Sequence, residues 1–113
     1  MNEAPGERRG YPRFLVQLPI AFSGDAISGD GMVIDISKGG WQVTVATTQG
    51  VPVGTDLALR IALPDHAAPM EVTLAVVRWS KGQKFGLEYL RMEDEEQERL
   101  RRFVSTLETG PSH

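Results

Sequence analysis

Residues 14–22 read FLVQLPIAF, and this stretch decides the fold class. Large apolar residues occupy every second position from Phe14 to Phe22, and more varied residues lie between them. A period of two held over nine residues is typical of a β-strand with one face against a core. Pro19 has no N–H to donate to a neighbouring strand, so we expect it at a sheet edge or a bulge.

Further stretches with the same alternation follow along the chain, separated by turn-forming residues. The expected strands cover residues 14–22, 31–36, 41–46, 56–63, 70–80 and 84–90. In the fifth strand the apolar face slips by one position near Val76 and Val77 and continues to Trp79, which indicates a β-bulge. Six short strands at near-regular spacing indicate an all-β antiparallel barrel or sandwich, and closure would remove exposed strand edges.

The period of the apolar residues changes after residue 93 to that of a helix. Asp94 is suited to cap the start of this helix, with Gln97 three positions later as in a capping box. One apolar stripe recurs at helical spacing, formed by Leu100, Phe103, Val104 and Leu107. We therefore expect one C-terminal α-helix packed on the sheet. The expected limits are 94–108 for the helix, 7–109 for the domain, 1–6 for a flexible leader and 110–113 for a tail.

The composition is that of a small soluble domain and argues against several classes of function. The chain has 113 residues, 41% hydrophobic and 24% charged, which is typical of one globular domain. Its net charge of −3 argues against DNA or RNA as a partner, since nucleic-acid binding usually requires a basic surface. The absence of cysteine excludes disulfides and thiolate metal sites and suits a reducing compartment. No apolar run is long enough to insert into a membrane and no signal-peptide core is visible, so we expect a cytoplasmic protein.

Two short polar motifs carry the chemistry. The first is Arg9-Gly10-Tyr11-Pro12-Arg13, an R-x-x-x-R preceded by Arg8, and the second is Asp35-Ile36-Ser37-Lys38-Gly39-Gly40, a D-x-S-x-x-G. Guanidinium groups form paired hydrogen bonds with phosphate oxygens and with the O6 and N7 edge of guanine. A carboxylate accepts from the opposite guanine edge, a serine hydroxyl suits a phosphate or a base, and a glycine turn admits a ligand close to the backbone. The two motifs together predict a guanine nucleotide with phosphodiester groups as the ligand.

These motifs, one just before the first expected strand and one after the second, resemble the PilZ domain family. The likeness extends to the last strands, where Val76-Val77-Arg78-Trp79 leads through a short turn to Phe85-Gly86-Leu87-Glu88-Tyr89 and an amphipathic helix. It covers roughly residues 7–107. The resemblance implies a six-stranded antiparallel β-barrel of bacterial origin that binds the second messenger cyclic di-GMP and acts as a receptor, not an enzyme, without a cofactor.

The resemblance also implies a set of ligand contacts. They are Arg8, Arg9, Arg13, Asp35, Ser37, Gly39 and Gly40, with Trp79 as a candidate ligand wall. In this family an arginine at the place of Arg8 favours a stacked pair of cyclic di-GMP molecules over a single one. We expect the ligand to draw the N-terminal Arg segment against the 35–40 turn, so that an unidentified partner protein recognises the ordered surface. The family implies control of motility, pili or exopolysaccharide by a monomer or a weak homodimer.

Simpler interpretations of the same residues stay open. The arginines could form an ordinary solvated basic patch, and Asp35 and Ser37 could serve only to cap a turn. Trp41 shares the phase of Val43 and is expected in the core rather than in a site. The main alternative function is a PilZ-like protein–protein adaptor that binds no nucleotide.

Catalytic and metal sites find little support. Ser37, His66 and Asp35 could be combined into a hydrolase triad, but the chain lacks the G-x-S-x-G elbow that commonly presents such a serine. His66 has no partner at a metal-ligand spacing, so no metal is expected. The acidic residues 93–98 are interpreted as a helix start with a solvent face rather than a paired-carboxylate site.

Overall fold

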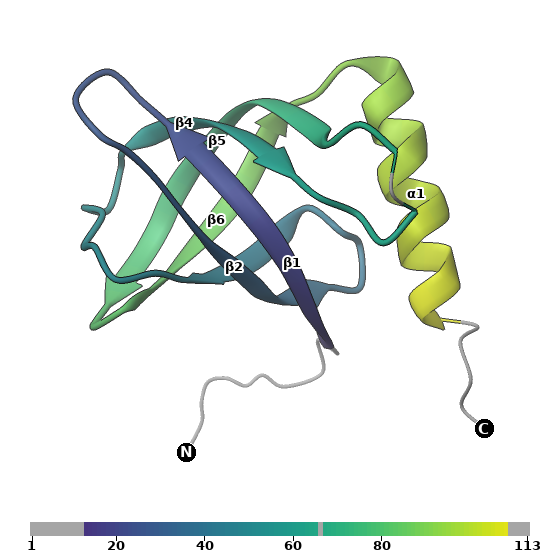
Figure 1. The fold of residues 1–113 in the computed structure, drawn as a ribbon, viewed down its shortest axis with the longest axis horizontal. Coiled ribbons are helices and arrows are strands. Elements are labelled where there is room, and N and C mark those ends of the chain that lie inside the picture. Colours follow the sequence, from purple (N-terminus) through teal and green to yellow (C-terminus); the bar gives the residue numbers. More distant parts are fainter. Residues whose placement is uncertain (1–12, 66, 109–113) are drawn as a thin grey trace.

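The computed structural model describes residues 13–65 and 67–108, which form a closed β-barrel with one helix (Figure 1). The elements are β1 (Arg13–Ser23), β2 (Ser28–Ser37), β3 (Gln42–Ala46), β4 (Asp56–Ile61), β5 (Met70–Lys81), β6 (Lys84–Arg91) and α1 (Asp94–Glu108). The strands follow one another around the barrel in the order β1-β2-β3-β6-β5-β4, and every neighbouring pair is antiparallel. The prediction of an all-β, six-stranded antiparallel barrel with one C-terminal helix is confirmed.

The period-two stretch of β1 supplies one wall of the core. Leu18, Ile20 and Phe22 are buried and the residues between them are exposed, as the alternation predicted. Phe22 meets Phe85 of β6 edge to face inside the barrel, with ring centroids 5.5 Å apart. Each large apolar side chain removed from water contributes about 1.5–3 kcal/mol, so this alternation is the main reason that the strands roll up around one core.

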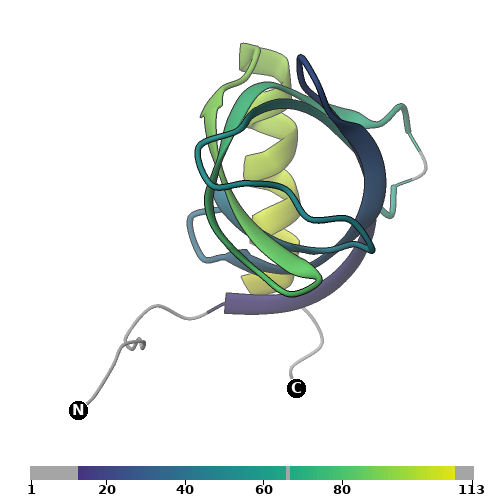
Figure 2. The same cartoon turned by 90° about the vertical axis from the view of Figure 1, so that its left-hand side faces the viewer.

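Helix α1 closes one end of the barrel, as Figures 1 and 2 show together. Leu100 and Val104 are buried there, and Phe103 and Leu107 pack half-buried beside them. The helix begins at Asp94 itself, and the side chain of Gln97 donates to the Met92 carbonyl at 3.0 Å. The Gln97 side chain therefore reaches back to the segment before the helix. Its partner is the carbonyl of Met92 rather than a group of Asp94, the expected cap residue.

Strand β5 contains two irregularities rather than one. Its register against β6 shifts between Leu74 and Ala75 and again between Val77 and Trp79. Val77 remains in the core with 1% exposure, but after the second shift Trp79 faces outward and is 43% exposed. The expectation that Trp79 continues the apolar face of β5 is therefore wrong, because a second bulge reverses the phase of the strand.

Other expectations differ in detail. Strand β2 begins at Ser28 rather than near residue 31. The connection from β1 is short, because Ser23 at the end of β1 already pairs with Ser28. Pro19 lies one residue before the ladder between β1 and β4 begins at Ile20, at the edge of that pairing. Its carbonyl accepts from Ala62 N at 2.9 Å. The expected leader (1–6), tail (110–113) and His66 lie outside the described residues.

Trp41 lies at the edge of the core. Trp41 is half-buried just before β3, and its ring lies 6.3 Å from that of Tyr89, so it packs on the core without being enclosed by it. Among residues 13–65 and 67–108, no helix has the length and hydropathy required to cross a bilayer.

Candidate functional site

The two sequence motifs meet across the first pair of strands. Arg13 begins β1 and Asp35 lies near the end of β2, and the antiparallel register places Arg13 opposite Ser37 and Leu15 opposite Asp35. Arg13 Nε donates to Asp35 Oδ1 at 2.9 Å. The side chains are 36% and 21% exposed, respectively. Residues 22 positions apart in the chain therefore share one charged contact at the surface of the barrel.

Ser37 organises the turn that follows Asp35. Its carbonyl accepts from Gly40 N at 2.9 Å, and its hydroxyl oxygen accepts from Gln42 N at 3.2 Å. Arg13 Nη2 donates weakly to the Gln42 carbonyl at 3.5 Å. The Ser37 hydroxyl is thus used as an acceptor, which leaves its own hydrogen available as a donor. Ser37 therefore has the turn-capping role that the sequence left open, and its contact with a ligand stays a prediction.

Gly40 lies under helix α1 rather than beside Arg13. Its φ is +89°, in the left-handed region that favours glycine. A Cβ built on Gly40 would lie 2.9 Å from Cγ2 of Val104 and 3.2 Å from Cγ of Leu100. Gly39 is exposed, and a Cβ there would meet nothing within 4 Å. Helix α1 therefore approaches the backbone at Gly40 so closely that the second motif requires a glycine there.

An open cavity of about 600 Å³ surrounds the Arg13–Asp35 contact on the outer wall of the barrel. Its lining comes from five neighbouring strands, β1, β2, β3, β6 and β5. The lining residues are Arg13, Ile34, Asp35, Gln42, Val43, Thr44, Arg78, Trp79, Lys84, Gly86 and Leu87. Of the residues singled out in the sequence, the structure gathers Arg13, Asp35 and Trp79 here, with Ser37 held nearby through Gln42. Gly39 and Gly40 are not among the lining residues.

The indole of Trp79 forms one side of this cavity by lying over Gly86. Trp79 and Gly86 are partners in the β5–β6 register, and a Cβ on Gly86 would overlap the indole ring. Gly86 is buried although it lies on the outer wall, because the indole covers it. Glycine inside a strand often marks such a close approach, which is the signal by which the sequence could have located this contact.

Positive charge extends along the cavity beyond the first motif. Arg78 Nε lies 2.7 Å from Glu88 Oε1, so its charge is partly matched. Lys84 lines the cavity and has no ion pair among the described residues. Arg78, Lys84, Gln42, Thr44 and Gly86 were not predicted as site residues, because only the pairing of β3 and β5 with β6 places them beside Arg13.

Several other predicted residues cannot be placed in this cavity. Arg8 and Arg9 lie outside the described residues, as does His66 of the hypothetical triad. Within the described ranges, no three His, Asp or Glu side chains gather in a way that could hold a metal ion. The acidic start of α1 is matched by arginines of the same helix, with Glu96 near Arg99 and Glu98 near Arg101.

Comparison with known proteins identifies the family. The sequence profile of the PilZ domain matches residues 7–106, nearly the whole chain. No curated protein matches significantly. Among solved structures, the inhibitor of motility MotI/DgrA from Bacillus subtilis superposes with a TM-score of 0.72 at 22% identity, over 95% of this chain. This chain spans about half, 54%, of that protein.

A second solved structure has a similar fold. The PilZ domain of CeSA from a cellulose-synthesizing bacterium gives a TM-score of 0.66 at 15% identity, over 86% of this chain and 98% of that one. At these identities the two structures support the fold alone. The profile match over 7–106, the closed barrel and the adjacency of the two motifs agree, and the chain belongs to the PilZ domain family.

Proposed function

We propose that this domain is a receptor for cyclic di-GMP, which binds in the cavity between Arg13 and Trp79. The observation that carries the proposal is the 2.9 Å contact between Arg13 and Asp35, because it joins the two polar motifs in one open cavity. Membership of a family of receptor and adaptor domains supports a binding role over a catalytic one.

The chemistry of the cavity suits a guanine nucleotide with phosphodiesters. Arg13 offers further N–H groups to a phosphate or to the O6 and N7 edge of guanine, and Asp35 offers an acceptor to the opposite edge. Lys84 adds a positive charge without an ion pair among the described residues. The exposed indole of Trp79 offers a flat apolar face on which a base can stack.

Arg13 is paired with Asp35 and Arg78 with Glu88, so the charge of Lys84 alone does not balance the two phosphates of cyclic di-GMP. Arg9 precedes Arg13 by four residues and Arg8 by five, so an extended segment would reach at most about 14–18 Å from Arg13. In this proposal the ligand draws Arg8 and Arg9 over the cavity against Asp35. The segment becomes ordered, and a partner protein that controls motility, pili or exopolysaccharide recognises the new surface.

One observation favours a second candidate, an adaptor that binds no nucleotide. Arg13 and Asp35 satisfy each other in the structure described, so both could serve only to join β1 and β2. An exposed pair of this kind stabilises a fold by about 1 kcal/mol or less, which is a weak reason to place two charges there. We therefore favour the receptor.

Titration calorimetry with cyclic di-GMP tests the proposal. Wild type should bind, and Arg9→Ala and Arg13→Ala should each lose about 1–3 kcal/mol of binding free energy, the value of a paired contact to guanine. Arg60→Ala is the matched control, because Arg60 lies on β4, pairs only loosely with Glu71 at 3.8 Å and does not line this cavity. Absence of heat and of any melting shift at about 1 mM ligand would favour the adaptor.

A further inference from the structure

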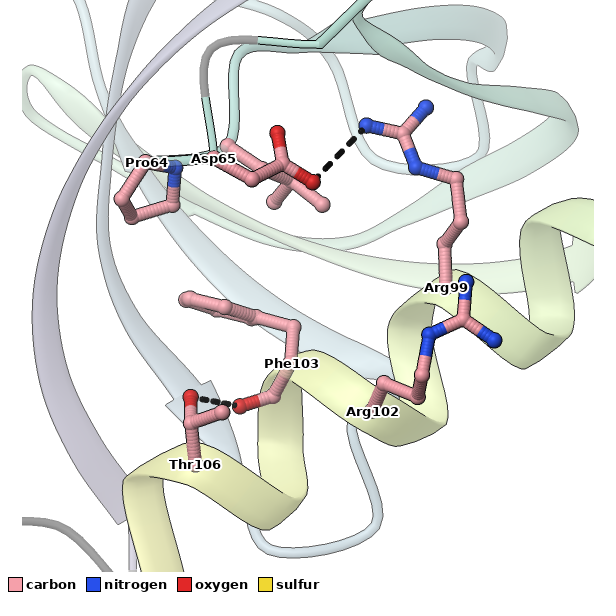
Figure 3. Close-up of a pocket in the computed structure, with 7 residues that line it drawn as sticks. Pro64, Asp65, Arg99, Arg102, Phe103 and Thr106 are labelled. Atoms are coloured by element: carbon pink, nitrogen blue, oxygen red, sulfur yellow. Dashed lines mark hydrogen bonds and ion pairs between the residues drawn. The ribbon is translucent and has the colours of Figure 1, made fainter.

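A second cavity lies between helix α1 and the connection from β4 to β5 (Figure 3). Its volume is about 350 Å³. The lining residues are Leu63, Pro64, Asp65, Arg99, Arg102, Phe103 and Thr106, none of which lines the cavity of Arg13 and Trp79. The proposed binding of cyclic di-GMP makes no use of these residues.

The floor of this cavity is apolar. Leu63 is buried at its base, and Pro64 follows at the surface. In Figure 3 the ring of Phe103 points from α1 toward Pro64 and Asp65, and this ring is only half-buried. A further apolar side chain placed here would remove part of Leu63, Pro64 and Phe103 from water, which is the main driving force for filling such a hollow.

The two arginines that line the cavity, Arg99 and Arg102, differ in how well their charges are matched. Arg102 and Arg101 share one carboxylate, that of Glu98. Arg101 has the shorter contact at 3.0 Å, whereas Arg102 Nη1 lies 3.7 Å from Glu98 Oε2. Because one carboxylate cannot neutralise two guanidiniums, the charge of Arg102 at the rim is incompletely matched.

Arg99 adds a second, partly unsatisfied cation on the same wall. Its Nη2 is buried without a hydrogen-bond acceptor, and the nearest carboxylate oxygen, Asp65 Oδ2, lies 3.6 Å away. Its Nη1 makes only a long contact of 3.4 Å to Glu96. A buried guanidinium nitrogen that lacks an acceptor is costly, so this wall favours a further hydrogen-bond acceptor, whereas the charge of Arg99 already faces the carboxylates of Asp65 and Glu96.

We propose that this cavity is a docking site for a partner protein segment that carries a large apolar side chain next to a carboxylate. The apolar side chain would pack on Leu63, Pro64 and Phe103, and the carboxylate would lie at Arg102. A volume of about 350 Å³ admits one leucine or phenylalanine side chain. The site does not depend on nucleotide binding, and it gives the receptor a surface at which a partner can be held.

Short peptides test this chemistry on the ¹⁵N-labelled 113-residue chain. The probe is acetyl-Gly-Leu-Asp-Gly-amide, and the matched probes replace its aspartate by asparagine or its leucine by serine. We expect saturable shifts of the Asp65, Phe103 and Thr106 amide signals with a Kd on the order of 1 mM. Each matched probe should bind about fivefold more weakly than the parent peptide, because it lacks either the exposed charge contact or the apolar anchor.

Two exposed arginines provide the matched variants. Arg102→Gln should weaken the probe about fivefold. Arg60→Gln should leave it unchanged, because Arg60 lies on β4, pairs with Glu71 and lines neither this cavity nor that of Arg13. Both side chains are about two-thirds exposed, at 66% for Arg102 and 65% for Arg60, so neither substitution removes a core contact.

Four outcomes would overturn the docking site: no shift at these amides, equal binding of the asparagine probe, equal loss in both variants, or shifts confined to the Arg13 cavity. A fifth is saturation of the same amides by octanoate as tightly as by the peptide, which would indicate a small carboxylic acid as the ligand. Cyclic di-GMP titration of the same variants reads out the other cavity, so failure of one proposal is distinguishable from failure of the other.

Discussion

Gly40 of the D-x-S-x-x-G motif packs directly beneath Val104 of helix α1. A Cβ on Gly40 would lie 2.9 Å from Cγ2 of Val104, and the backbone there has a φ of +89°. The turn that holds Ser37 near the Arg13 cavity is thus also the turn that supports the helix across the end of the barrel. The same glycine connects the site to the packing of α1.

Gly40→Ala should therefore destabilise the fold. A side chain at positive φ is strained and the added methyl group crowds Val104, so we expect a loss of about 1–3 kcal/mol in the free energy of unfolding. Urea denaturation followed by circular dichroism measures it. Gly39→Ala is the control, because a Cβ at Gly39 meets nothing within 4 Å and its φ is not positive. Equal midpoints for the two variants would contradict the role assigned to Gly40.

Gly86→Ala should displace the indole of Trp79. The added Cβ would occupy the place of the ring, so the indole must move further into solvent at small cost to stability. In a Trp41→Phe background, the emission of Trp79 should shift to longer wavelength, and cyclic di-GMP should bind more weakly if the base stacks on this ring. Gly50→Ala should change neither quantity, because Gly50 has no neighbour within 4 Å. An unchanged emission spectrum would refute this packing.

The hydroxyl of Tyr89 should make the fold sensitive to alkaline pH. Burial raises its pKa well above the usual value because the phenolate would lose its hydration inside the barrel. The unfolded chain releases this proton near the ordinary pKa of about 10. The folded state holds it more tightly, so the stabilisation is fully present below about pH 10 and is lost as the pH rises further.

Tyr89→Phe isolates this effect, because it removes the titrating group. Above about pH 10, the free energy of unfolding of wild type should fall by about 1.4 kcal/mol per pH unit relative to the variant. Urea denaturation of both proteins between about pH 8 and 11 provides the comparison. Parallel pH profiles would show that Tyr89 does not titrate on unfolding.

Arg8 should decide how many ligands the receptor holds. If an arginine at this place supports a stacked pair, then wild type should bind about two cyclic di-GMP molecules per chain and Arg8→Ala about one. The stoichiometry from calorimetry gives the answer, with Arg60→Ala expected to behave as wild type. One ligand per wild-type chain would remove the argument for a pair and leave the receptor proposal intact.

Much of the fold was predictable because its signals are local. The alternation from Phe14 to Phe22 and the helical stripe through Leu100 and Val104 each depend on which face of one element is buried. The site was less predictable. Arg78 and Lys84 have no motif of their own, and they join Arg13 only because β6 pairs with both β3 and β5. Their positions depend on strand register between segments distant in the chain.

The sequence by itself determined the fold class, the expected family and the pair of motifs that meet at Arg13 and Asp35. Only the tertiary structure decided that Trp79 faces outward over Gly86 and that Gly40 supports the helix. The physical reason is that burial patterns repeat within a strand, whereas a bulge or a contact between distant segments depends on how complete strands pack around one closed core.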